Sequence, residues 1–191
     1  GIPQSAFVVG SFQKDGVGWE DGMDPKFIKG PDVFLETMKR LKKNIPELFV
    51  LLSGPARGYV KKGLVSADIP YLHVYMRSYP DIAKLYQALD LYVVSSRQEG
   101  GPKAVLESMA TGVPLVTTQV GQAKDLVKNG KNAFMADVGN VEALTAYALQ
   151  VHTSSQSDIR FMLLAGRKTA EANSYESQIP LWAEFMKGFV E

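Results

Sequence analysis

Short apolar runs alternate with longer amphipathic stretches along almost the whole of this 191-residue chain. Several of the runs, such as LFVLLS at 48–53 and LYVVSS at 91–96, are apolar at successive positions and rich in β-branched or aromatic residues. A strand needs that pattern when helices cover both faces of its sheet. The alternation therefore predicts an α/β fold, with a parallel sheet of about six strands and helices on both faces.

Turn residues and hydrophobic periodicity set the expected bounds of these elements. The expected strands are Ala6–Phe12, Leu48–Ser53, Leu72–Met76, Leu91–Ser95, Pro114–Thr118 and Ala133–Ala136. The expected helices are Pro31–Asn44, Ala56–Val65, Asp81–Leu89, Pro102–Thr111, a turn near Lys124–Val127, Val141–Thr153, Ile159–Ala172 and Glu176–Val190. The last helix is unusually apolar for a surface helix, and ordinary core packing is the favoured interpretation, with docking onto an absent domain as the alternative. Its apolar residues are Leu181, Trp182, Phe185, Met186 and Phe189.

Composition narrows the function classes open to the chain. A net charge of +1 gives no global reason to expect nucleic acid or an anionic membrane surface as a partner, so local groups must hold any bound anion. There is no cysteine, which excludes disulfides, thiolate metal sites and a thiol nucleophile. No apolar run reaches the ~18–20 residues that span a bilayer, and no charged-then-apolar leader opens the chain. Because Gly1 stands first rather than Met, we expect the sequence to be an excerpt of a longer protein or a processed product.

The segment Ser95–Val116 carries the residues best suited to chemistry. There an apolar strand ends and Gly100-Gly101-Pro102 opens a helix. Glycines allow backbone N–H groups to approach a ligand, and a helix N-terminus offers unsatisfied donors to an anion such as a diphosphate. Glu99 precedes this anion site and Glu107 follows it. Two carboxylates would repel a phosphate unless each binds neutral hydroxyls, and a sugar nucleotide has vicinal diols on both sides of its phosphates.

The same segment resembles a known family. E-G-G-P-x4-E followed by S-M-A-T-G-V-P-L-V is similar to the Glu-x7-Glu signature of the family 4 retaining glycosyltransferases. Those enzymes have the GT-B architecture, in which two Rossmann-like domains enclose a cleft. A lone Glu-x7-Glu occurs by chance in many helices, but here neighbouring segments follow the family's order from about Val8 to Leu149. These segments are Val8-Val9-Gly10, Lys29-Gly30-Pro31-Asp32, Leu51–Gly54, Asp81–Tyr86, Ala88–Leu91, Val120-Gly121 and Asn129–Ala133.

The resemblance implies a role for each residue of the signature. Glu107 would hold the ribose hydroxyls, and Glu99 the hydroxyls of the transferred sugar. The backbone amides of Gly100 and Gly101, ahead of Pro102, would face the phosphates or the sugar.

Further residues follow from the family's other segments. Lys29 would neutralise the diphosphate leaving group and so stabilise charge that develops in the transition state, which makes Lys29 and Glu99 the expected catalytic residues. Gly10 would lie at the nucleotide, and Arg77 and Tyr79 would edge the base pocket. The family needs no metal and the sequence offers no metal cluster, so we expect no cofactor besides the donor substrate, a nucleoside-diphosphate sugar.

The chain departs from the family mainly in its first βα loop. The family carries an arginine directly after the first glycine, whereas this chain has Ser11 and then a long insertion, residues 14–27. Lys14 is the expected replacement for the arginine. The acidic residues of the insertion lack the spacing of a calcium loop, which favours a mobile flap. Farther along, Gln122 replaces a glycine of the family and Asp125 a glutamate.

We therefore predict that residues 1–173 form the donor-binding domain of a retaining hexosyltransferase, and that residues 174–191 form a helix directed at an absent N-terminal acceptor domain. A non-catalytic nucleotide-binding module and one half of a sugar-nucleotide epimerase remain open as alternatives. A dinucleotide oxidoreductase is disfavoured, because the first βα loop lacks G-x-G-x-x-G. Without the acceptor domain the chain is expected to turn over substrate poorly.

The expected partners are the nucleotide sugar and the missing domain, with no nucleic acid and with membrane contact only through the missing domain. The expected location is the cytoplasm, at the inner face of the membrane for the longer protein.

Overall fold

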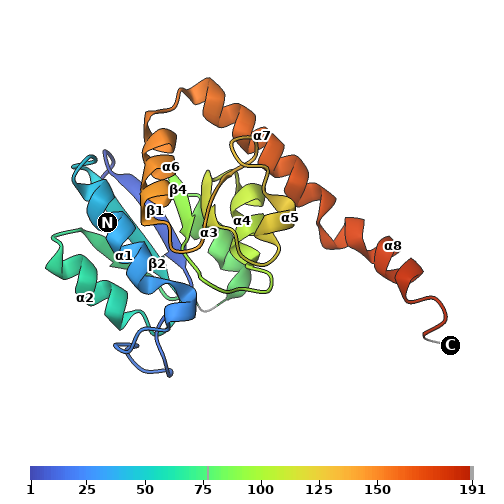
Figure 1. The fold of residues 1–191 in the computed structure, drawn as a ribbon, viewed down its shortest axis with the longest axis horizontal. Helices are drawn as coiled ribbons and strands as arrows, with labels where there is room; N and C mark the ends of the chain where they lie inside the picture. Colours follow the sequence, from blue (N-terminus) through green and yellow to red (C-terminus); the bar gives the residue numbers. More distant parts are fainter. Residues whose placement is uncertain (77, 190–191) are drawn as a thin grey trace.

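Six parallel strands form one twisted sheet at the centre of the molecule (Figure 1). The structure is a computed structural model and describes residues 1–76 and 78–189. The strand order is β3-β2-β1-β4-β5-β6, the doubly wound order of a Rossmann-like domain, which confirms the predicted sheet. The strands are β1 (Phe7–Phe12), β2 (Leu48–Ser53), β3 (Tyr71–His73), β4 (Leu91–Val94), β5 (Leu115–Thr118) and β6 (Phe134–Ala136).

Helices cover both faces of the sheet. One face packs with α1, α2 and α6 into a continuous apolar core, and the other packs with α3, α4 and α5, while α7 lies against α4. The helices are α1 (Pro31–Lys42), α2 (Gly58–Ser66), α3 (Ile82–Tyr86), α4 (Lys103–Thr111), α5 (Ala123–Leu126), α6 (Val141–Thr153), α7 (Gln156–Ala172) and α8 (Tyr175–Phe185). Two 3-10 turns, η1 (Phe27–Lys29) and η2 (Tyr79–Asp81), precede α1 and α3.

The two-sided cover explains the unbroken apolar runs. Every residue of β2 is buried, and successive side chains of a strand point to opposite faces. Val50 and Leu52 accordingly join the core under α1, α2 and α6, while Leu51 is buried on the other face. Each such leucine or valine contributes about 1.5–3 kcal/mol on leaving water.

Strand β3 is shorter than predicted, because it is an edge strand that depends on β2 alone. The register pairs Leu52 with His73, and β2 ends one residue later at Ser53. Gly54 then turns the chain away with a φ of +93°. The N–H of Val74 still donates to the carbonyl of Leu52, but Tyr75 and Met76 lie beyond the end of β2. The expected strand Leu72–Met76 is therefore wrong at its end.

Helix α8 leaves the body of the molecule and projects beyond it (Figure 1). None of its residues is buried, and Trp182 and Phe185 are 61% and 66% exposed. The prediction that core packing explains this apolar stripe is therefore wrong for this chain. Among the described residues, no helix combines the length and apolarity needed to cross a bilayer.

Candidate functional site

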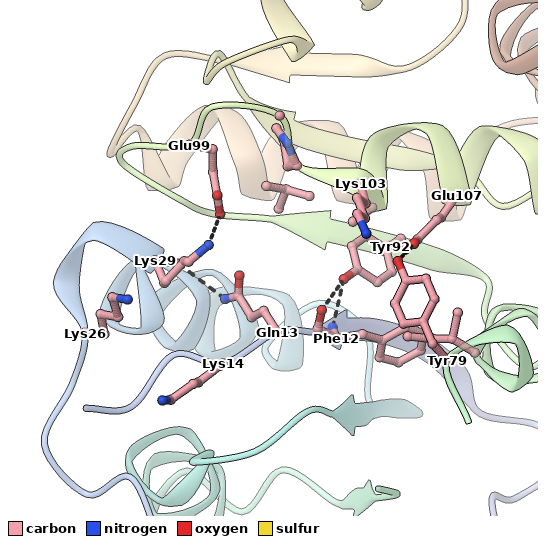
Figure 2. A pocket seen from close by; sticks show the side chains of 15 residues that line it. Phe12, Gln13, Lys14, Lys26, Lys29, Tyr79, Tyr92, Glu99, Lys103 and Glu107 are labelled. Carbon is pink, nitrogen blue, oxygen red and sulfur yellow. Dashed lines mark hydrogen bonds and ion pairs between the residues drawn. The ribbon is translucent and has the colours of Figure 1, made fainter. Parts of the chain in front are cut away.

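A cavity of about 330 Å³ opens at the carboxyl ends of β1 and β4 (Figure 2). These strands are neighbours in the sheet, but the chain continues from them in opposite directions, to β2 and to β5. In an open α/β sheet, ligands bind at this reversal of strand order. The lining residues are Phe12, Gln13, Lys14, Lys26, Lys29, Tyr79, Ile82, Tyr92, Val94, Glu99, Gly101, Pro102, Lys103, Ala104 and Glu107.

Tyr92 forms the floor of the cavity at the point where β1 and β4 separate. The two strands pair only through Val9 and Gly10 of β1. Beyond them, the N–H of Phe12 donates to the hydroxyl oxygen of Tyr92 at 2.8 Å, in place of a strand-pairing bond. Burial raises the pKa of Tyr92 to about 12, so this hydroxyl stays neutral at physiological pH.

Lys29 and Glu99 form an ion pair across one end of the cavity. The Lys29 ammonium lies 2.6 Å from Oε1 of Glu99, and the Ser96 hydroxyl donates to the same oxygen at 2.9 Å. Figure 2 shows the two side chains reaching toward each other, Lys29 from the loop before α1 and Glu99 from the loop after β4. The two predicted catalytic residues are thus brought together, and the charge of each is partly neutralised by the other.

A second ion pair holds these two loops together. The Arg97 guanidinium binds Asp32 in a bidentate manner, at 2.7 and 2.6 Å, and its hydrogen bonds to the carboxylate hold the pKa of Asp32 below its ordinary value. Gly30 allows the close approach, since its φ is +63° and a Cβ there would lie 2.0 Å from the carbonyl oxygen of Ser95. Lys29 and Glu99 therefore meet because their supporting backbones are fixed to each other.

Glu107 lies at the other end of the cavity, on α4, where two tyrosines bind its carboxylate. The Tyr79 hydroxyl donates to Oε1, and the Tyr86 hydroxyl donates to Oε2 at 3.0 Å. Tyr86 is completely buried, whereas Tyr79 is 56% exposed and comes from η2. Burial, together with the Glu107 carboxylate, raises the pKa of both phenols, so both remain donors at neutral pH.

The N-terminus of α4 lies between the two carboxylates. The helix begins at Lys103, and Pro102 is its N-cap rather than its first residue, without a side-chain cap. Within the described part of the chain, the amides of Gly100 and Gly101 donate to no carbonyl or side-chain oxygen. Gly121, with a φ of +47°, lets the next loop pack against this turn, because a Cβ there would lie 2.0 Å from the Gly100 carbonyl oxygen. The amides are available to an anion.

Two other predicted residues, Gly10 and Lys14, are placed differently from what we expected. Gly10 lies outside the cavity, which corrects the prediction: it is buried within β1, where a Cβ would lie 2.3 Å from a methyl group of Leu89. Lys14 lines the cavity, but its ammonium lies over the Trp19 ring, 3.7 Å from the centroid. Arg77 falls outside the described residues.

The insertion is anchored at its base by a buried ion pair that the sequence analysis missed. Arg57 and Asp15 both have fully buried side chains, and Nε of Arg57 lies 3.0 Å from Oδ1 of Asp15. The guanidinium also donates to the carbonyls of Ser11, Gln13 and Ser53, at 2.6, 3.1 and 2.8 Å. It therefore joins the ends of β1 and β2 to the start of the insertion.

The far part of the insertion is fixed as well. The N–H of Val17 donates to the carbonyl of Asp24, which closes the loop on itself. The amides of Gly58 and Tyr59, at the start of α2, donate to carbonyls of Asp21 and Gly22. The insertion is thus attached to the rest of the domain at its base, through Asp15, and at its far part, through Asp21 and Gly22. This differs from the mobile flap that we expected.

The cavity is locally cationic. Four lysines and two glutamates line it, a surplus of two positive charges, whereas the whole chain carries only +1. Within residues 1–76 and 78–189, no three histidine, aspartate or glutamate side chains are grouped as metal ligands would be.

A doubly wound sheet with this cavity at its switch point defines a Rossmann-like domain. The chain belongs to the glycosyl transferases group 1, because the model of that family matches residues 25–161, which is more than half of the sequence.

Named relatives agree with this assignment. The chain is 33% identical over 127 residues to the lipopolysaccharide core biosynthesis mannosyltransferase LpsB of Rhizobium meliloti, covering 57% of this chain and 36% of LpsB. A glycosyltransferase structure from Rickettsia africae matches with a TM-score of 0.82 at 19% identity, over 99% of this chain and 49% of that one. Anabaena HepE in complex with UDP-glucose matches with a TM-score of 0.71 at 22% identity, over 87% and 44%. The chain spans less than half the length of these relatives.

Proposed function

We propose that this chain is the donor-binding domain of a retaining glycosyltransferase that moves a hexose from a nucleoside-diphosphate sugar to an acceptor hydroxyl. The observation that carries the proposal is the placement of two carboxylates on one cationic cavity, with a helix N-terminus between them. Glu107 and Glu99 lie at opposite ends of the cavity in Figure 2. Each end offers the acceptor for a sugar diol, and the middle offers donors for phosphate.

Glu107 is the proposed ribose ligand. Its two oxygens already accept hydrogen bonds from the hydroxyls of Tyr79 and Tyr86, so this carboxylate is positioned to accept from hydroxyl groups. Tyr86 is buried and fixes the carboxylate from behind. The exposed Tyr79 hydroxyl occupies the place that a ribose hydroxyl would take.

Glu99 and Lys29 are the proposed groups at the reacting sugar. Glu99 would accept from the hydroxyls of the hexose, and Lys29 would turn from Glu99 toward the diphosphate as negative charge develops on the leaving group. The amides of Gly100 and Gly101 would bind the phosphate oxygens. Because the cavity already carries surplus positive charge, we propose that no metal ion is needed.

An adjoining cavity of about 350 Å³ is the proposed base pocket. It is lined by the turn after β2 and by the segment after β3, including Gly54, Pro55 and Tyr75, and it shares Tyr79 with the first cavity. Its lining is mainly apolar, as a stacked base requires.

An N-terminal acceptor domain is the proposed partner of α8. The relatives named above are more than twice as long as the matched part, and Leu181, Trp182 and Phe185 form an uncovered apolar face. The proposal requires that the longer protein transfers sugar efficiently while this chain alone does not, because the chain holds only half of the reacting groups.

Calorimetric titration of the chain with UDP, GDP, ADP and their hexose conjugates tests the function. We expect at least one diphosphate to bind with a micromolar to millimolar dissociation constant. The absence of binding by all of them at millimolar concentration, with the circular dichroism spectrum of the fold intact, would contradict the proposal. In the longer protein, the anomeric configuration of the product tests retention.

Tyr79→Phe should tighten binding of the same diphosphate by about two- to tenfold, since it removes a hydrogen bond of about 0.5–1.5 kcal/mol that ribose must displace. The ring remains, so contacts with the base are kept. Titration of both proteins measures the ratio. Weaker binding by the variant would mean that the Tyr79 hydroxyl contacts the ligand and does not compete with it.

A further inference from the structure

The insertion places a third lysine at the end of the cavity occupied by Lys29 and Glu99. Lys26 lines the cavity together with Lys14 and Lys29, and all three lie on the same side of it in Figure 2. Lys26 was not among the residues predicted from the sequence, because nothing in the sequence shows that the end of the insertion returns to the sheet.

The ammonium groups of the three lysines differ in the groups that they contact. The Lys29 ammonium is paired with Glu99 at 2.6 Å, and the Lys14 ammonium lies over the Trp19 ring. Lys26 is in no ion pair with any residue that the structure describes. It is therefore the lysine that can receive an anion without giving up an existing contact.

The backbone of Lys26 is held in place by the insertion's anchor. Its N–H donates to the carbonyl of Asp15 at 2.8 Å, and its own carbonyl accepts from the N–H of Lys29 at the same distance. Asp15 is in turn paired with the buried Arg57. Lys26 is thus connected by short, described contacts to the ends of β1 and β2 on one side and to Lys29 on the other.

We propose that Lys26 binds the diphosphate of the donor, and that the insertion is a fixed arm whose function is to present this lysine. The inference rests on the proposed function and deepens it. The family has an arginine where this chain has Ser11, and Lys26, 15 positions later, would provide the positive charge that Ser11 lacks. Lys26 and Lys29 would bind different oxygens of the diphosphate, with Lys29 shared between the diphosphate and Glu99. A lysine is suited to this as a compact charge with three donors.

Lys26→Ala tests the proposal through the binding of the diphosphate compared with its parent nucleoside. The probe is whichever of UDP, GDP and ADP binds the wild-type chain, titrated at low salt. We expect the variant to bind the diphosphate about five- to tenfold more weakly, as for the loss of one partly exposed charged hydrogen bond, and to bind the nucleoside within about twofold of the wild type. Lys26→Arg should restore most of the loss, because it restores the charge.

Lys168→Ala is the matched control, since it removes the same charge from an exposed position on α7 away from the cavity. Diphosphate affinity within about twofold of wild type in Lys26→Ala would overturn the proposal, as would an equal loss in Lys168→Ala, which would indicate a general charge effect. An equal loss for diphosphate and nucleoside would also overturn it. Failure of all three diphosphates to bind the wild-type chain is a different result, because it overturns the proposed function itself.

Discussion

Replacing Glu107 with alanine is expected to weaken binding of the nucleoside diphosphate by about 10- to 150-fold, which corresponds to about 1.5–3 kcal/mol. The ribose diol loses its charged acceptor, and a charged hydrogen bond contributes more than a neutral one. Because Tyr79 competes for the same carboxylate in the free protein, we expect a value in the lower half of this range. Calorimetric titration of wild type and variant measures the ratio.

The control for this variant is Glu142→Ala, which removes a glutamate that is 90% exposed on α6. Its affinity should match that of the wild type. Glu107→Ala also leaves the buried Tyr86 hydroxyl without its acceptor, so the unfolding midpoint must be measured in parallel. A folded variant that binds the diphosphate as tightly as wild type would remove Glu107 from the ribose site.

Replacing Arg57 with methionine is expected to cost about 3–5 kcal/mol of unfolding free energy, the usual effect of removing one partner of a buried ion pair. The substitution leaves the Asp15 carboxylate buried and unpaired, and it removes the donor from three carbonyls at the ends of β1, β2 and the start of the insertion. Urea denaturation followed by circular dichroism measures the loss.

Arg160→Met is the control, at an exposed position on α7, and should change stability by less than about 0.5 kcal/mol. The double variant Asp15→Asn/Arg57→Met should lose less than the sum of the single losses, because the two residues are in contact. Burial raises the pKa of Asp15, and the charge of Arg57 is the largest effect that opposes it, so the pKa of Asp15 should rise further when Arg57 is removed. A carboxyl with a raised folded-state pKa destabilises the protein as pH rises through that value, so the deficit of Arg57→Met should be smaller at pH 5 than at pH 8. A deficit below about 1 kcal/mol at neutral pH would contradict the anchoring role.

The sequence predicted the sheet well because that information is local. Apolar runs such as Leu48–Ser53 and Leu91–Val94 are covered on both faces, and each occupies the strand that its pattern predicts. The end of β3 was predicted incorrectly because it depends on where β2 stops, which is a relation between segments. For the same reason, the apolar stripe of α8 could not be assigned to core or surface from its pattern alone.

The site was predicted in part. Lys29, Glu99, Gly101 and Glu107 line one cavity. Glu99, Gly101 and Glu107 were named from one motif with fixed spacing, and Lys29 from a separate segment that resembles the family. Residues that act through long-range contacts gave no such signal. The sequence assigned no individual role to Tyr86, Tyr92 or Arg57, although each forms polar contacts with distant segments.

The structure of the insertion depends on a long-range contact that the sequence alone does not reveal. A long loop with several acidic residues indicates mobility, and nothing in it shows that Asp15 faces a buried arginine 42 positions away. That contact changes the interpretation of the loop from a flap to a support for Lys26.

The division of labour between the two carboxylates is the central claim, and one comparison tests it directly. Calorimetric titrations give the dissociation constants of a nucleoside diphosphate and of its hexose conjugate for the wild type, for Glu99→Ala and for Glu107→Ala. Glu107→Ala should weaken both ligands by the same factor, because both carry the ribose. Glu99→Ala should leave the diphosphate within about twofold, or slightly tighter because Lys29 is released, and weaken the conjugate by about tenfold or more. Equal losses for both ligands in Glu99→Ala would contradict the assignment of Glu99 to the transferred sugar.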